Sequence, residues 1–329
     1  LEPITMLAAI AVATTRIGLI ATGSSTYTEP FNLARQFASI DHISQGRAGW
    51  NIVTSWMAAA ARNFGDTGQL SHSERYALAE EHVQIVKGLW DSWADDTIID
   101  DRQNAVFANT DRIRPIDFKG EYFNVAGPLN LPRGPQGHPV LVQAGSSEDG
   151  RGFAARHAEA VFTAHIEKTT AQAFYSDMKK RVAAEGRRPD QVLILPGLCP
   201  TIASTEAEAK RLLLELSNYA DVEIAVKYLG TWFGGHDFSH LPLDRPLTVA
   251  DFPDLSHIET SKSRTEMVIN LIQREDLTLR ELLARFAHIG GHYLFAGTAE
   301  QVADLIEDWF SDVLETVENN IESYKKSYE

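Results

Sequence analysis

Short β-branched runs alternate with amphipathic segments of helical period along most of the chain, and this alternation limits the fold more than any other feature. It is typical of βα units around a parallel sheet. We expect strands at residues 16–22, 47–54, 139–145, 158–164 and 191–198, and helices at residues 30–43, 73–93, 171–185 and 205–219. With 329 residues, the chain is long enough for one α/β barrel of ~250 residues or for two domains.

The charge balance narrows the class of partner. The chain has 45 acidic and 30 basic residues, a net charge of −15, which opposes binding to nucleic acid or to an anionic membrane surface. We therefore expect a small-molecule substrate or a protein partner, and a homo-oligomer. The single cysteine, Cys199, excludes an internal disulfide framework and fits a reducing, cytoplasmic location. Its setting after an apolar run predicts a buried structural thiol.

The two ends of the chain differ from its middle. The apolar opening imitates a secretory signal poorly, because Glu2 and Pro3 stand where basic residues are expected and Arg16 interrupts the run. Since the chain starts with Leu1, we expect that it begins inside a longer protein. Residues 311–329 show apolar positions at three- and four-residue spacing and predict a C-terminal amphipathic helix, with residues 1–310 forming the main domain.

Two long connections interrupt the βα pattern. Residues 94–138 alternate and contain turn residues, which predicts an extra hairpin or an irregular flap. Residues 229–258 are rich in Gly, Pro, Asp and His, and we expect residues 234–253 to help cover a site.

The common catalytic motifs are missing from the sequence: there is no GxxxxGK[ST], no GxGxxG after a strand, no HExxH, no GxSxG and no CxxC. Two histidine pairs, His236 with His240 and His288 with His292, have a four-residue spacing that brings ligands together only in a helix. Glycines and turn residues around them argue against helices, so no metal site is predicted.

Polar residues in two elements are candidates for a ligand. Asn51 lies inside an expected strand, where a buried amide must find a partner, either a ligand or the neighbouring backbone. His72 and Tyr76 share one face of the first turns of a helix. They suit a phosphate, or equally the capping and packing of that helix.

The stretch VQAGSSEDGRGFAARH joins a strand to a helix. Gly145 permits a tight turn, and Ser146 and Ser147 then stand at a helix N-terminus, where unpaired N–H groups attract anions. Glu148 and Asp149 satisfy the helix dipole without a ligand and would repel a phosphate unless they point away. The residues leave phosphate binding and ordinary capping open.

Taken together, several blocks of the sequence resemble one family. These blocks are LEPITMLAAIAVATTRIGLIATGSSTYTEPFNLARQFASIDHISQGRAGWNIVTS, ARNFG, HSERYALAEEHVQIVKGLWDSW, the stretch from FKGEYF to FTAH, and GTAEQVADLIEDWF. In order and length they are similar to the two-component, reduced-flavin-dependent monooxygenases of the nitrilotriacetate, EDTA and dibenzothiophene-sulfone type, within the bacterial luciferase superfamily. The resemblance covers residues 1 to about 310.

The resemblance implies a (β/α)8 TIM barrel with FMN at the carboxyl ends of its strands. Carried over by position, Thr22 and Asn51 would lie near the isoalloxazine ring, His72 and Tyr76 near the ribityl phosphate, and Ser146 with Ser147 around the phosphate. It also implies that a separate NAD(P)H:flavin reductase supplies FMNH2, that O2 reacts to give a C4a-peroxyflavin, and that this oxygenates a small organic substrate. No catalytic acid or base follows from it.

The chain departs from the family pattern at both ends. The family carries about two further βα units before the segment that matches Leu1, and a last strand after EDWF, so we expect an incomplete barrel. This departure motivates a non-catalytic flavin-binding or scaffold protein as the alternative function. A hydride-transferring enzyme that uses a deazaflavin is a weaker alternative, because the blocks resemble the oxygenases more closely.

Overall fold

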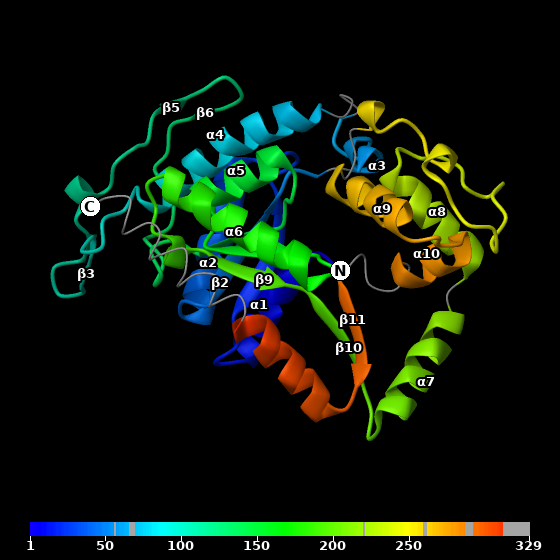
Figure 1. Cartoon of the computed structure of the whole chain (residues 1–329). Helices are drawn as coiled ribbons and strands as arrows, with labels where there is room; N and C mark the ends of the chain where they lie inside the picture. The colour runs from blue at the N-terminus through cyan, green and yellow to red at the C-terminus, as the bar shows by residue number, and fades with distance from the viewer. Residues whose placement is uncertain (56, 66–69, 220, 259–261, 287–291, 312–329) are drawn as a thin grey trace, which may run out of the picture. The chain divides into compact units, whose positions relative to one another are not determined.

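The computed structural model describes residues 1–55, 57–65, 70–219, 221–258, 262–286 and 292–311 (Figure 1). These residues form two compact units. The first contains Leu1–Val161 and Gln191–Leu193, and the second contains Phe162–Asp190 and the chain from Ile194 onward.

Parallel strands form the framework of the first unit. In sheet order they are β1 (Leu19–Ser24), β2 (Ala48–Val53), β7 (Val140–Gln143), β8 (Ala160–Thr163) and β9 (Leu193–Pro196). The unit boundary passes through β8 and β9. In β1 the side chains alternate, so that Leu19 and Ala21 are buried while Ile20 and Thr22 are exposed. The first four expected strands are confirmed, with their ends shifted by a few residues, and the fifth is confirmed only in part.

Helices cover the buried face of these strands. They are α1 (Pro3–Ala13), α2 (Pro30–Ser44), α4 (His72–Trp90) and α5 (Glu148–His157), and a short helix, α3 (Ala58–Ala61), follows β2. Leu33 and Phe37, one turn apart on α2, are fully buried in the same cluster as Trp50 of β2 and Trp90 of α4. The rings of Trp50 and Trp90 meet edge to face with centroids 6.5 Å apart. This core fixes the strands that lead into the candidate site.

The connection at residues 94–138 contains two hairpins, as its alternation predicts. They are formed by β3 (Ile98–Asp101) with β4 (Val106–Ala108), and by β5 (Phe118–Lys119) with β6 (Asn124–Val125). In Figure 1 the β5–β6 hairpin runs beside α4. The Glu81 carboxylate of α4 accepts hydrogen bonds from the backbone N–H groups of Glu121, Tyr122 and Phe123 in its turn. One side chain therefore anchors the hairpin to the helix.

The second unit contains a parallel strand pair and a group of helices. The pair is β10 (Leu198–Ile202) with β11 (Tyr293–Gly297), and the helices are α6 (Lys168–Ala184), α7 (Glu206–Asn218), α8 (Val222–Trp232), α9 (Lys262–Arg274) and α10 (Leu279–Phe286). Residues 299–311 are also helical. Figure 1 shows α7 beside the strand pair, and α8, α9 and α10 gathered together. The expected strand at residues 191–198 is divided into β9 and β10 at Gly197, which corrects the sequence interpretation.

The segment at residues 233–258 is folded around aromatic side chains. Phe233, Phe238 and Phe252 are buried, with ring centroids 5.2–5.4 Å apart. Arg245 binds Asp251 at 2.6 Å. This ion pair and the hydrogen bonds from Thr248 lower the pKa of Asp251 to about 2, because they outweigh desolvation, which raises it. The turn-rich composition therefore encodes a packed excursion.

Within the described residues there are four short 3-10 helices, at Thr110–Arg112, Pro189–Gln191, Val249–Asp251 and Leu255–His257. Among the described helices, none is long and apolar enough to cross a membrane. The expected C-terminal helix at residues 311–329 lies almost entirely outside the described residues, so it stays a prediction, as does a separate domain at residues 1–310.

Candidate functional site

The carboxyl ends of β1 and β2 bring two of the predicted site residues together. Thr22 stands opposite Asn51 in the parallel register, and the Asn51 Nδ2 donates a hydrogen bond to the Thr22 Oγ1 at 3.0 Å. The Asn51 Oδ1 is buried and accepts no hydrogen bond from any described residue. A buried acceptor without a donor is costly, so this oxygen suits a ligand N–H.

The loop after β1 is tied to the end of β2. The Ser24 and Ser55 hydroxyls lie 2.6 Å apart, and the Thr26 hydroxyl donates to the Thr54 carbonyl at 2.9 Å. Buried His82 of α4 contacts the carbonyl of Thr28 through Nε2 at 2.8 Å. Burial lowers the pKa of His82 to about 4, so its ring stays neutral and donates to that carbonyl. These contacts give the strand ends a defined shape, and sequence reasoning did not identify them.

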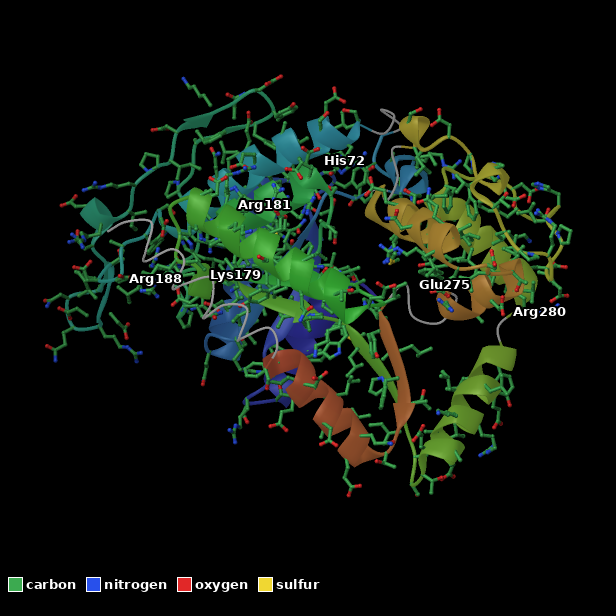
Figure 2. The ribbon with its side chains drawn as sticks, in the orientation of Figure 1. His72, Lys179, Arg181, Arg188, Glu275 and Arg280 are labelled. Carbon is green, nitrogen blue, oxygen red and sulfur yellow. The ribbon has the colours of Figure 1, made fainter. Side chains whose placement is uncertain are left out.

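The first turns of α4 present His72 and Tyr76 on one face. The helix begins with a capping box in which Ser71 accepts from the backbone N–H of Glu74, and the Glu74 carboxylate accepts from the Ser71 N–H. The rings of His72 and Tyr76 have centroids 5.0 Å apart. Figure 2 shows His72 at this end of α4. Their predicted adjacency is confirmed, whereas their ligand stays a proposal.

The N-terminus of α5 meets the same face of α4. Ser147 is the N-cap, and its Oγ accepts from the Gly150 N–H at 3.2 Å and lies 3.2 Å from the His72 Nε2. Ser146 is half-buried in the turn directly before it. Ser147 therefore caps the helix and also faces the His72 ring, whereas phosphate binding by this stretch stays a prediction.

Tyr76 connects this helix start to both strand ends. Its phenol lies close to the side chains of Ser147, Gln143 and Thr54, and burial raises its pKa, although these three polar neighbours partly oppose the shift. The group therefore remains a neutral donor. Sequence reasoning missed Gln143 and Thr54. Their signal was present, since each stands at or directly after the carboxyl end of a strand.

Two glycines permit this close packing. A Cβ on Gly145 would lie 2.5 Å from the Gln143 Nε2 and 2.6 Å from the Tyr76 hydroxyl. A Cβ on Gly150 would lie 2.8 Å from the same hydroxyl. Only glycine at both positions lets the turn and the helix start approach Tyr76 this closely.

Both acidic residues at the start of α5 have basic partners. Glu148 binds Arg151 of its own helix at 3.1 Å, and the Asp149 Oδ2 lies 2.8 Å from the His72 Nδ1. The repulsion expected between these acids and an anion is therefore reduced by neighbouring groups.

A second set of charges joins α4 to α5 two turns further along. Glu80 binds His157 at 2.7 Å and Arg156 at 3.2 Å, and Lys87 lies 3.3 Å from the His157 Nδ1. Partial burial raises the pKa of Glu80, but the hydrogen bond from His157 and the charges of His157 and Arg156 outweigh it and lower the pKa to about 2. The contacts of Glu80 with His157 and Arg156 fix how α4 and α5 lie against each other, and so how their first turns bring His72, Tyr76 and Ser147 together.

The other sequence candidates lie in the second unit. The ring centroids of His236 and His240 are 6.4 Å apart in a segment that is not helical, and His292 precedes β11, whereas His288 is outside the described residues. Across the described ranges, no group of three or more His, Cys, Asp or Glu side chains is placed to hold a metal ion. Cys199 on β10 is only partly buried, which corrects the expectation of a buried thiol, because β10 has a single strand neighbour, β11, among the described residues.

Residues 1–316 match the luciferase-like monooxygenase family. The chain is 46% identical to N-acetyl-S-(2-succino)cysteine monooxygenase of Bacillus subtilis (strain 168), covering 94% of this chain and 69% of that protein. It is 45% identical to nitrilotriacetate monooxygenase component A of Aminobacter aminovorans, covering 94% and 67%.

Among solved structures, DmoA from Hyphomicrobium sulfonivorans is similar with a TM-score of 0.83 and 30% identity, covering 95% of this chain and 65% of that one. The chain thus spans about two thirds of the length of these relatives.

Proposed function

The chain belongs to the luciferase-like monooxygenase family, as a flavin-dependent oxidoreductase of the two-component type, and we propose that the cluster on β1, β2, α4 and α5 is its FMN site. The resemblance drawn from the sequence blocks is confirmed, and so is the luciferase-like TIM-barrel fold with a parallel sheet. Enzymes of this type use reduced FMN to oxygenate small organic substrates. The proposed absence of two βα units and a last strand is not established.

One observation carries the assignment of the site. His72, Tyr76 and Ser147, from elements about 70 residues apart in sequence, converge at the N-terminus of α5, directly after strand β7. Helix N–H groups, two hydroxyls and an imidazole make a donor set that suits a phosphate dianion. The buried, unpaired Oδ1 of Asn51 suits an N–H on the edge of the flavin ring. Both ends of FMN therefore find fitting groups in the first unit.

The residues of this chain bind, orient and shield rather than attack. When bound, reduced FMN supplies the electrons that activate O2 for transfer of one oxygen atom to the substrate. Ser147, His72 and Tyr76 would hold its phosphate, and Asn51, oriented by Thr22, would fix the ring. Buried side chains on the helix-covered face of the strands, Trp50 above all, hold in place the strand ends that carry Thr22 and Asn51.

Substrate, partner and location belong to the same proposal. The names of the two relatives above point to small substrates with several carboxylates, and we propose a carboxylate-bearing amine or thioether for this chain. A separate NAD(P)H:flavin reductase is the proposed source of reduced FMN. A homo-oligomer, a cytoplasmic location and a covering role for residues 234–253 stay predictions.

Oxygen consumption tests the activity. With a reductase, NADH and FMN supplied, we expect O2 uptake that depends on one member of a panel of aminopolycarboxylates, S-succinylated thiols and sulfones, and a product one oxygen atom richer by mass spectrometry. Tight FMN binding with peroxide as the sole product across the panel would support the non-catalytic alternative. Failure to bind either oxidised or reduced FMN would refute both functions.

A further inference from the structure

Asp149 occupies a place that electrostatics alone does not explain. It stands in the first turn of α5, whose N-terminus is the proposed phosphate site, and a carboxylate there repels a phosphate. Its Oδ2 lies 2.8 Å from the His72 Nδ1. A carboxylate only accepts hydrogen bonds, so the Nδ1 must carry the proton of that bond. The His72 Nε2 is consequently the nitrogen that faces the Ser147 hydroxyl, 3.2 Å away.

His72 and Asp149 differ in how far their side chains are exposed to solvent. The side chain of His72 is 14% exposed, whereas that of Asp149 is 48% exposed. The imidazole is thus held in the cluster, against the ring of Tyr76, while the carboxylate approaches it from the solvent side. Partners placed behind a binding imidazole set which nitrogen is protonated and how the ring is turned.

We propose that Asp149 is a positioning residue for the flavin phosphate. It holds His72 with Nδ1 donating to its own carboxylate and Nε2 turned toward Ser147, and so fixes the edge of the ring that would meet the phosphate. This inference rests on the proposed FMN site. It assigns to Asp149 a favourable contribution to phosphate binding that is larger than its direct repulsion of the same phosphate.

Glu148 provides a matched control within the same turn. It is also acidic and exposed, and it forms an ion pair with Arg151 rather than with His72. Direct repulsion predicts that neutralising either acid strengthens phosphate binding. Positioning through His72 predicts that neutralising Asp149 weakens it. The two explanations therefore differ in the sign of the effect.

The experiment compares FMN with riboflavin, which lacks the phosphate, on the full chain. Dissociation constants are measured by fluorescence titration for the unchanged protein, Asp149→Asn and Glu148→Gln. We expect Asp149→Asn to weaken FMN binding about tenfold, the equivalent of one charge-assisted hydrogen bond. Riboflavin binding should change by less than about twofold, and Glu148→Gln should leave FMN binding unchanged or stronger.

A double-mutant cycle shows whether the effect passes through His72. In a His72→Gln background, Asp149→Asn should have no further effect on the FMN affinity. Nitrogen NMR of the imidazole should show Nδ1 protonated in the unchanged protein and a redistributed proton in Asp149→Asn, a signature that loss of packing would not produce. This signal also remains readable if the variant has lower stability.

Three results would overturn the inference. They are stronger or unchanged FMN binding in Asp149→Asn, an equal loss of riboflavin binding, and an Asp149→Asn effect that persists without His72. They differ from failure of the proposed function, in which the unchanged protein binds no flavin. Equal affinity of the unchanged protein for FMN and riboflavin would remove the phosphate site and this inference together.

Discussion

The ion pair between Glu80 and His157 gives a prediction whose size follows from the structure. In Glu80→Gln the side chain keeps its shape and can still accept a hydrogen bond, but the charge that binds His157 and Arg156 is lost. The pKa of Glu80 falls from 4.5 to about 2 in the folded chain, which corresponds to roughly 3 kcal/mol of stabilisation. Because the Glu80 side chain is 28% exposed, solvent screening reduces this to about 1.5 kcal/mol.

The pH dependence of this loss has a definite sign. Since the pKa of Glu80 is lowered by folding, its contribution is fully present above about pH 4.5 and disappears as the pH falls toward about 2. At pH 7 the free energy of unfolding in urea should therefore be lower for Glu80→Gln than for the unchanged protein. This difference should shrink below pH 4.5.

The control for this measurement is Glu121→Gln, which changes an exposed carboxylate in the β5–β6 turn and should have an effect within about 0.5 kcal/mol. Equal unfolding free energies of Glu80→Gln and Glu121→Gln at pH 7, with unchanged urea dependence, would refute the assigned role of the ion pair. A difference between them that grew on acidification would refute its sign.

Three further substitutions test other parts of the first unit. Ser147→Ala should weaken FMN binding by about 1 kcal/mol or more in a calorimetric titration, and riboflavin binding less, because the phosphate loses a hydroxyl; equal losses would return Ser147 to a purely capping role. Asn51→Leu should weaken binding of FMN and riboflavin alike by about 1–2 kcal/mol, since both contain the ring, and a loss confined to FMN would contradict that placement. Arg47→Met should lower the free energy of unfolding by about 2 kcal/mol, because its guanidinium binds the carbonyls of Ala11 and Thr14 at the end of α1, and an unchanged urea midpoint would show those bonds to be replaceable by water.

Much of the fold of the first unit could be predicted from local pattern. Strands β1, β2 and β7 combine β-branched runs with turn residues at both ends, so their periodicity is visible in a single sequence. Helices α8, α9 and α10 were not predicted. The apolar faces of α8 and α10 pack against each other, with the rings of Trp232 and Phe286 5.6 Å apart, and a single sequence does not show that long-range contact. Gly197 divides a single apolar run into β9 and β10, and periodicity gives no sign of that break.

The site could be predicted only in part for a related reason. His72 and Tyr76 share a helical face, and that adjacency follows from sequence spacing alone. The approach of Ser147 to the same face is a long-range contact. The sequence does not show it, and so it left phosphate binding and helix capping by Ser147 equally open. Gln143 and Asp149 were not assigned because their roles depend on which neighbour each side chain meets, which spacing does not encode.

The two glycines around Tyr76 have a consequence for altering this enzyme. A methyl group at either position meets the phenol or its partners at less than 3 Å, so the turn has no room in which new side chains can be tried. Laboratory evolution toward other substrates should therefore collect its useful changes away from residues 145 and 150. Libraries that spare this turn will contain a larger share of variants that still pack Tyr76 as the unchanged protein does.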